Sequence, residues 1–230
     1  MWEELALITL LGGAVAADTT ASFQFLISSP LVACTAAGWI LGDVHTGLLV
    51  GVLLQVPWMV ELPIGGARFA HGNLGSLVAA AAAIWLTRAS GRPDFSLWVG
   101  VAYGVAVAAI GGYGIVQMRR LNRRLLRKAD LCAEQADTAC ITRANLAGAF
   151  HAFCLGLLLT GMFGAVALFV LPALVPIVPA SLDRLFAATK PVLFGLTLGA
   201  ALHLFWERWN VWALLAGLAA GFLLVFGGVA

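Results

Sequence analysis

The chain has 230 residues, of which 62% are hydrophobic and only 10% are charged, and its formal net charge is +2. Ordinary soluble domains carry about 25% charged residues. These proportions therefore exclude such a domain and predict an integral membrane protein, in agreement with a mean hydropathy of +0.98. The small net charge, with no basic stripe interleaved with aromatic residues, gives no indication of nucleic-acid binding.

The first apolar segment, residues 4–17, follows Met1-Trp2-Glu3-Glu4. This start lacks the positively charged region that opens a secretory signal peptide. We therefore expect the first helix to be retained in the mature protein. A polar break then extends from Asp18 to Ser29.

The next stretch contains apolar runs at residues 31–42 and 44–60, which are short for straight membrane-spanning helices of ~20 residues. The runs are interrupted or followed by turn-forming residues: Gly42-Asp43, Pro57, Pro63 and Gly65-Gly66. Broken helices at membrane depth are tolerated only where they are buried in protein or line a watery cavity. The pattern predicts a transport site, with Gly42, Asp43, Gly65 and Gly66 as structural turn residues.

Residues 74–85 form an alanine-rich run that predicts a re-entrant or half helix, and residues 95–117 are long enough to span a bilayer. Residues 118–145 then hold the main charge cluster, with six basic residues between Arg119 and Lys128. By the positive-inside rule, this loop is cytoplasmic. Its interspersed leucines favour an amphipathic helix on the inner membrane surface.

Residues 146–170 return across the membrane and are ended by Pro172, Pro176 and Pro179. The last apolar runs, 191–206 and 209–226, are separated by Glu207-Arg208, which we expect on the cytoplasmic side. The sequence thus predicts one all-α integral membrane domain over residues 1–230. It is a multi-helix bundle with short, broken or re-entrant helices in residues 1–90, the basic loop at 118–145 and C-terminal membrane helices at 146–230.

No motif indicates a catalytic nucleophile, a catalytic metal or a bound nucleotide. The four cysteines, Cys34, Cys132, Cys140 and Cys154, show no paired spacing, and we interpret them as small core residues or reduced thiols. We therefore expect no cofactor and no metal site. The candidate chemistry lies instead in polar residues within apolar surroundings, which need a partner or water.

Glu61 and Arg68 flank the break at Pro63 to Gly66, either as an interfacial ion pair or as residues that line a polar cavity. Gln55 carries a donor and an acceptor on one amide, which suits the recognition of hydroxyl groups. A contact between helices is the alternative for Gln55.

His71 and Asn73 follow the glycine break as cavity residues, or as a hydrogen-bonded loop residue and a helix cap. Asp18 and Gln24 are candidates in the first polar break. Asp43 is interpreted first as a turn-stabilising carboxylate. His151 and His203, alone on apolar helices, are interpreted as packing residues.

The segment PLVACTAAGWILGDVHTGLLVGVLLQ at residues 30–55, followed by Ile64-Gly65-Gly66, resembles the signature region of the mannose/fructose/sorbose-type membrane subunit IIC of the bacterial sugar phosphotransferase system. The residues that carry the resemblance are Gly38, Leu41, Gly42, Asp43, Thr46, Gly47 and Gly51. The chain departs from the family at Gln55 (glutamate in the family), Ser29 (arginine) and Ala70-His71 (Pro-Asp), and it is about one helix shorter.

The resemblance implies a sugar-translocating subunit in the bacterial inner membrane that pairs with a IID membrane subunit and assembles into trimers of IIC–IID pairs. Cytoplasmic IIB and IIA subunits would supply the phosphoryl group, so the chain would not be an enzyme by itself. Gln55 and Gln24 would then contribute to the sugar site. The departures leave an alternative, a degenerate homologue that acts as a facilitator or a regulatory membrane anchor. A lipid-modifying membrane enzyme is disfavoured because the four histidines are dispersed.

Overall fold

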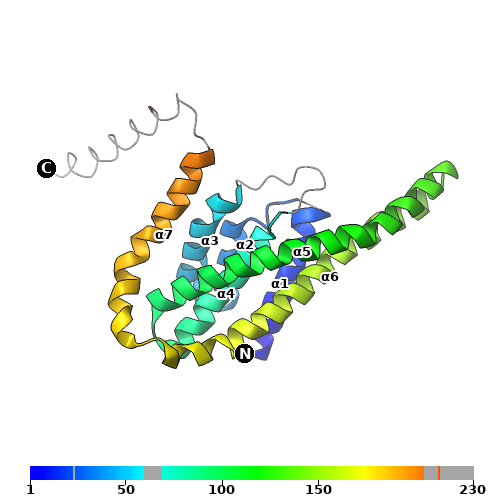
Figure 1. The fold of residues 1–230 in the computed structure, drawn as a ribbon. Coiled ribbons are helices and arrows are strands. Elements are labelled where there is room, and N and C mark those ends of the chain that lie inside the picture. Colours follow the sequence, from blue (N-terminus) through cyan, green and yellow to red (C-terminus); the bar gives the residue numbers. More distant parts are fainter. Residues whose placement is uncertain (23, 60–68, 205–211, 213–230) are drawn as a thin grey trace.

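A computed structural model describes residues 1–22, 24–59, 69–204 and 212, and within these residues the chain is helical without strands (Figure 1). This confirms the predicted all-α class. The α-helices are α1 (Trp2–Thr20), α2 (Pro30–Ile40), α3 (Val44–Met59), α4 (Gly72–Ser90), α5 (Pro93–Glu134), α6 (Thr138–Phe169) and α7 (Asp183–Leu204). Two 3-10 helices, η1 (Leu171–Ile177) and η2 (Ala180–Leu182), connect α6 to α7.

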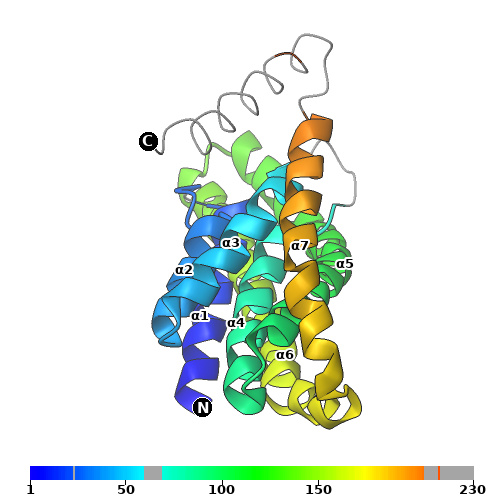
Figure 2. The same ribbon diagram turned by 90° about the vertical axis from the view of Figure 1, so that its left-hand side faces the viewer.

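Helix α4 lies at the centre of the body, in contact with α1, α2, α3, α5 and α6 (Figure 2). Its alanine-rich sequence leaves it buried from Leu74 through Leu86, as expected for a helix that is apolar on all sides. Small residues also let α5 approach closely, because a Cβ at Gly104 would collide with Ala79 of α4. The run predicted as a half helix is therefore a complete 19-residue core helix.

Helices α2 and α3 form a short hairpin of 11 and 16 residues that turns at Gly42-Asp43. Gly42 has a φ of 73°, a left-handed conformation that glycine adopts without strain. The Asp43 carboxylate accepts a hydrogen bond of 3.0 Å from the backbone N–H of Thr46 in the first turn of α3. Gly47 keeps the two helices close, since a Cβ there would meet the carbonyl of Cys34.

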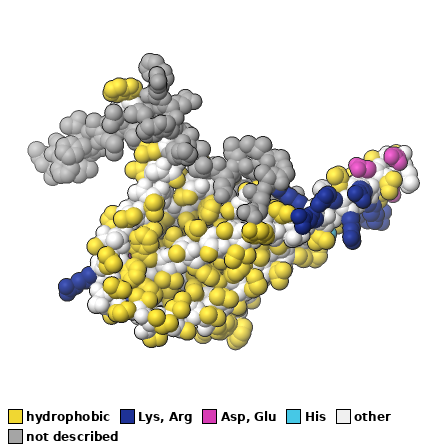
Figure 3. Space-filling view, viewed as in Figure 1, with side chains coloured by type: hydrophobic (Ala, Val, Ile, Leu, Met, Phe, Trp, Pro, Cys, Tyr) yellow, Lys and Arg dark blue, Asp and Glu magenta, His cyan; other side chains and the backbone are white. Residues whose placement is uncertain are grey.

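Helices α5 and α6 form a long hairpin that projects beyond the body (Figure 1). Both contain an apolar stretch long enough to cross a membrane, in the segments Pro93–Glu134 and Thr138–Ile177. The 42 residues of α5 span about 63 Å, roughly twice the apolar thickness of a bilayer. Residues 118–134 thus continue α5, whereas the sequence predicted a loop with a separate helix lying on the membrane surface. Figure 3 shows that most of the Lys and Arg side chains visible in this view gather on the projection.

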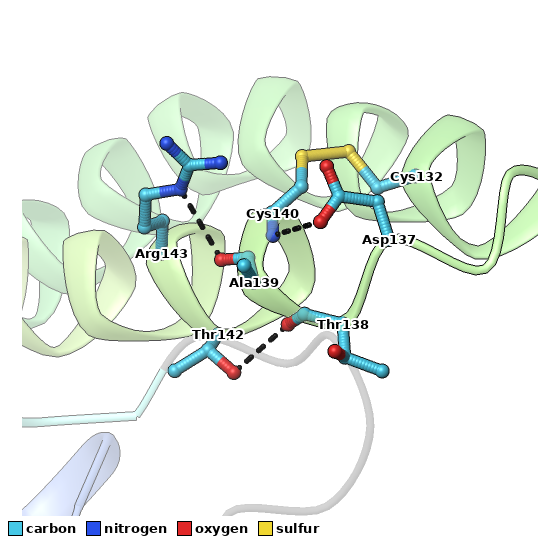
Figure 4. The surroundings of a disulfide bond; sticks show 7 residues. All are labelled: Cys132, Asp137, Thr138, Ala139, Cys140, Thr142 and Arg143. Carbon is cyan, nitrogen blue, oxygen red and sulfur yellow. Dashed lines mark hydrogen bonds between the residues drawn. A yellow bond between two sulfur atoms is a disulfide. The ribbon is translucent and has the colours of Figure 1, made fainter.

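A disulfide joins Cys132 to Cys140 across the turn at the tip of the hairpin (Figure 4). The Asp137 carboxylate accepts a hydrogen bond of 2.9 Å from the backbone N–H of Cys140 and so caps α6. The prediction that all four cysteines are core residues or free thiols is therefore wrong for this pair, because the tight turn brings together side chains eight positions apart in sequence. Cys34 and Cys154 are free thiols, and Cys34 is buried.

The described C-terminal helix begins after the predicted proline-rich break, which forms η1 and η2. Helix α7 begins at Asp183, eight residues before the predicted run, and contains Pro191 within it. It packs against α3 and α5 at the edge of the body. Of the predicted run at 209–226 only Trp212 is described, and the Glu207-Arg208 pair lies outside the described residues.

Large hydrophobic side chains cover much of the outer surface of the body (Figure 3). Examples are Leu10 of α1, Trp39 of α2 and Ile110 of α5, which are all exposed. A soluble protein rarely exposes apolar surface on this scale, whereas a protein surrounded by lipid is expected to do so.

Candidate functional site

A polar pocket of about 430 Å³ lies where α1 and α3 end and α4 begins. Its size falls within the usual range for small-molecule sites. Most of its wall comes from the non-helical residues between α1 and α2 and from those just before α4. The lining residues are Asp18, Thr19, Gln24, Leu26, Ser28, Trp58, Phe69, Ala70, His71, Gly72 and Asn73.

Asp18, near the end of α1, organises the first polar break. Its side chain is only 4% exposed. The carboxylate accepts hydrogen bonds from the backbone N–H groups of Phe25, at 2.7 Å, and Ser28, at 2.9 Å. Gln24 adopts a left-handed φ of 51° within the same break. Asp18 therefore holds the segment that carries Gln24 and Ser28 against the pocket.

Asn73 and His71 hold the opposite wall in place. The Asn73 side-chain amide donates a hydrogen bond of 3.3 Å to the Thr19 hydroxyl, which ties α4 to α1. The His71 backbone N–H donates to the carbonyl of Ala108 in α5 at 2.8 Å. Both contacts fix the start of α4, where His71 and Asn73 belong to the pocket lining.

Gln55 lies next to this pocket in a smaller cavity of about 160 Å³. The two cavities share four lining residues: Leu26, Ser28, Trp58 and Asn73. The Gln55 side-chain carbonyl accepts a hydrogen bond of 3.0 Å from the backbone N–H of Leu31, at the start of α2. Gln55 therefore lines a small cavity and also joins α3 to α2.

Two side chains of the main pocket carry buried polar atoms that lack hydrogen-bond partners among the described residues. His71 is 1% exposed, and neither of its ring nitrogens is hydrogen-bonded. The indole N–H of Trp58 is also unpartnered. Leaving such a group unsatisfied costs about 1–3 kcal/mol. Groups of this kind at a pocket are therefore suited to bind a polar ligand or water.

The structure brings Asp18, Gln24, His71 and Asn73 to one pocket, with Gln55 beside it. Gly42 and Asp43 form the α2–α3 turn and do not line either cavity. His151 contacts Asn122 of α5 at 2.6 Å, which agrees with its predicted packing role. Four predicted residues, Glu61, Gly65, Gly66 and Arg68, lie outside the described residues.

Sequence reasoning missed Trp58 and Phe69 as pocket residues. The signal for Trp58 was its position three residues after Gln55, which places both on one face of a helix. Gly72 lies against the Trp58 ring, since a Cβ there would collide with the indole. Phe69 had no comparable signal, because it lies outside the helices, where residue spacing does not define a shared face.

Comparison with known proteins places this architecture in a family. Residues 2–226 match the family described as "PTS system sorbose-specific iic component". The chain belongs to this family. The resemblance in residues 30–66 is thereby confirmed, and the chain is a multi-pass membrane subunit, a transporter component of the phosphotransferase system and not an enzyme by itself.

Among curated relatives, the chain is 26% identical over 188 residues to "N-acetylgalactosamine permease IIC component 1" of Escherichia coli strain K12, which covers 82% of the chain and 68% of the relative. It is 31% identical over 113 residues to the sorbose-specific EIIC component of Klebsiella pneumoniae, covering 49% and 40%. The mannose-specific EIIC component of Escherichia coli strain K12 is 26% identical over 127 residues, covering 55% and 45%. The chain thus spans less than half the length of the last two relatives.

Two solved structures have the same fold. One, titled "Structure of membrane protein", aligns with a TM-score of 0.72 and 15% identity over 98% of this chain and 87% of the other. The second is a cryo-electron microscopy structure of the mannose transporter ManYZ in complex with microcin E492. It aligns with a TM-score of 0.59 and 21% identity over 100% of this chain and 84% of the other.

Proposed function

We propose that the chain is the sugar-translocating IIC subunit of a mannose-type phosphotransferase system, and that the pocket between α1, α3 and α4 holds the sugar. The observation that carries this assignment is that the ring nitrogens of His71 and the indole nitrogen of Trp58, two residues of this pocket, are buried without a hydrogen-bond partner among the described residues. A sugar presents several hydroxyl groups that both donate and accept hydrogen bonds. The imidazole and the indole N–H are therefore satisfied when the sugar binds.

The other pocket residues complete this site. Gln24 and Asn73 supply amide groups for hydroxyl recognition, and Asp18 adds a carboxylate whose geometry is fixed by the backbone of residues 25 and 28. The flat ring of Trp58 offers an apolar surface for the C–H face of a sugar. Gln55 of α3 is proposed as a further contributor. Glu61 and Arg68, which lie outside the described residues, are proposed as contributors from the sequence alone.

The proposed partners follow from the family. A IID membrane subunit would pair with this chain, in trimers of IIC–IID pairs, within the bacterial inner membrane. Cytoplasmic IIB and IIA subunits would deliver the phosphoryl group. The structural likeness to a mannose transporter supports a translocating fold.

Sugar binding to the purified membrane complex tests this function. The ligand panel is N-acetylgalactosamine, mannose and sorbose, measured by calorimetry. His71→Leu should weaken binding by about tenfold to a hundredfold, because it removes hydrogen bonds to the sugar. The same change should leave thermal stability unchanged or higher, because it also removes an unsatisfied buried group.

Thr160→Val is the matched control. Thr160 is also fully buried with an unpartnered hydroxyl, but it lies between α1 and α6, away from the pocket. Its replacement should not change sugar binding. If the wild-type complex binds none of these sugars, the sugar-site assignment is wrong and the membrane-anchor alternative is supported.

A further inference from the structure

The smaller cavity at Gln55 adjoins the sugar pocket, as we call the proposed sugar site between α1, α3 and α4. This side cavity lies between the start of α2 and the end of α3. Trp58 and Asn73 belong to both linings, so the two cavities meet at these residues. The residues that line the side cavity and not the sugar pocket are Ser29, Pro30, Gln55 and Met59. A substituent on a sugar ring in the pocket can therefore reach the side cavity.

Polar groups around the side cavity have hydrogen-bonding capacity to spare. The Leu31 N–H occupies the side-chain carbonyl of Gln55, which leaves the Gln55 NH2 group without a partner among the described residues. Asn73 is used in the opposite sense, because its NH2 group donates to Thr19 and its side-chain carbonyl accepts no hydrogen bond within the described part of the chain. The buried indole N–H of Trp58 is unpartnered there too. The side cavity is thus bordered by free donors and a free acceptor.

The rest of the side cavity suits a neutral group that is larger than a hydroxyl. Pro30, Met59 and Leu26 add apolar surface, and the described lining residues include no ionisable side chain. Burial of a charged substituent without a partner would be costly. The volume of about 160 Å³ is several times the ~30 Å³ that a water molecule occupies in the liquid. A ring hydroxyl, which is about the size of a water molecule, therefore leaves most of the side cavity unfilled.

We propose that the side cavity receives the acetamido group of an N-acetylated amino sugar. This group combines a carbonyl acceptor, an N–H donor and a methyl group. Its carbonyl accepts a hydrogen bond from the Gln55 NH2 group, and its N–H donates to the side-chain carbonyl of Asn73. Its methyl group packs against Pro30 and Met59. The inference rests on the proposed function, because it takes the pocket at His71 as the site of the sugar ring.

This assignment makes Gln55 and Asn73 specificity-determining residues. A parent hexose, with a hydroxyl group in place of the acetamido group, is too short to satisfy both of them. A site built to hydrogen-bond one group discriminates against an analogue that lacks it, because polar groups of the site are then left unpaired. The side cavity should therefore favour the acetamido sugar over the hexose with the same ring.

Paired ligands on the purified membrane complex measure this preference by calorimetry. The pairs are N-acetylgalactosamine with galactose, N-acetylglucosamine with glucose and N-acetylmannosamine with mannose, so that the two members of a pair differ in one substituent only. At least one acetamido sugar should bind the wild type about tenfold or more tightly than its parent hexose. Equal affinities in all three pairs would overturn the inference while the sugar site stands.

Gln55→Glu tests the donor to the acetamido carbonyl. The carboxylate still accepts the hydrogen bond from the Leu31 N–H and so keeps α3 joined to α2, but it has no N–H to donate. The preference for the acetamido sugar should fall about tenfold, whereas the affinity for the parent hexose should change less than about threefold. Equal losses for both members of a pair would contradict the role proposed for Gln55.

Ser29→Leu tests the space of the side cavity and leaves Gln55 and Asn73 in place. Ser29 lines only the side cavity, and its side chain makes no capping hydrogen bond to α2. The leucine side chain should fill the space and weaken binding of the acetamido sugar about tenfold or more, with the parent hexose within about twofold of wild type. Ser29→Ala is the matched control, because it keeps the space open and should keep the preference.

The outcomes of this experiment separate the inference from the proposed function. Full preference for the acetamido sugar in Ser29→Leu would mean that the substituent does not enter the side cavity, and the inference would be wrong. If the wild-type complex binds no sugar of either kind, the proposed function itself fails.

Discussion

The two ends of the helical body differ in how their polar side chains are paired. At the end where α4 passes into α5, Arg92 donates to the Asp183 carboxylate at 2.7 Å and to the carbonyls of Val178 and Pro179. Arg88 pairs with Glu4 at 2.8 Å, which ties α4 to α1. At the opposite end, the ring nitrogens of His71 and the indole N–H of Trp58 are buried and have no hydrogen-bond partner among the described residues.

We infer from this difference that the paired groups hold the helices together, whereas the unpaired groups are available to bind a ligand. Arg92 satisfies carbonyls in the proline-rich connection and so fixes η1 and η2 to the body. The unpartnered groups at the other end stabilise nothing within the described chain, and they lower stability until a ligand or water satisfies them. Paired groups should therefore affect stability when removed, and unpaired groups should affect binding.

The largest effect is expected from a substitution in the packed core between the two ends of the body. Gly104→Val should prevent stable folding, because its side chain would collide with Ala79 and with the backbone at Gly75 in the central helix. The measurement is the yield of monodisperse protein after detergent extraction. Gly199→Val is the control, since a Cβ at Gly199 meets no atom within 4 Å. A normal yield for Gly104→Val would contradict the close packing of α4 and α5.

Arg92→Met tests the paired end. It removes the partner of Asp183 and of the carbonyls in the connection, and we expect a loss of about 2 kcal/mol in stability because Arg92 is largely buried. Lys190→Met removes a more exposed pair with Asp94 and should cost less than about 1 kcal/mol. Thermal unfolding in detergent measures both. Sugar binding that fell with Arg92→Met in the folded fraction would show that the two ends are coupled.

Gln55→Leu tests a residue that both joins two helices and lines a cavity. Its side-chain carbonyl bonds to the Leu31 N–H, and its amide lines the cavity beside the sugar pocket. Sugar affinity should fall by about tenfold and stability by about 1 kcal/mol. The membrane complex should remain assembled, as judged by size-exclusion chromatography. Full sugar affinity in this variant would show that Gln55 only holds α3 and α2 together.

Cysteine labelling tests which side of the membrane each end faces, without an expected effect on stability. In a background without native cysteines, Arg127→Cys on the projection and Ser181→Cys in η2 are both on exposed positions. We expect a membrane-impermeant maleimide to label Ser181→Cys in intact cells and Arg127→Cys only after permeabilisation. The reverse pattern would overturn the topology inferred from the basic residues.

Local sequence signals predicted the short helices well. The Gly42-Asp43 turn, the polar break after α1 and the proline-rich end of α6 all depend on residues that act within a few positions of one another. Polar residues in apolar surroundings were also visible in sequence, and Asp18, Gln24, His71 and Asn73 line one pocket.

Two features of the structure were not predicted. The continuation of α5 through the basic segment follows from a run of good helix-forming residues such as leucine and arginine, but charge alone had suggested a helix lying flat on the membrane. The contribution of Phe69 to the lining of the main pocket requires the packing of α1, α4 and α5. No spacing pattern within one segment of the sequence predicts this contribution.

The disulfide at the hairpin tip links the topology of the protein to the redox chemistry of its surroundings. Bacterial cytoplasm keeps thiols reduced, whereas the periplasm is oxidising. The basic residues of the projection predict a cytoplasmic position, and there Cys132 and Cys140 would be reduced in the growing cell and would form the observed disulfide only when an oxidant reaches them. Alkylation of both residues in rapidly quenched cells would therefore report the compartment of the tip without any engineered label.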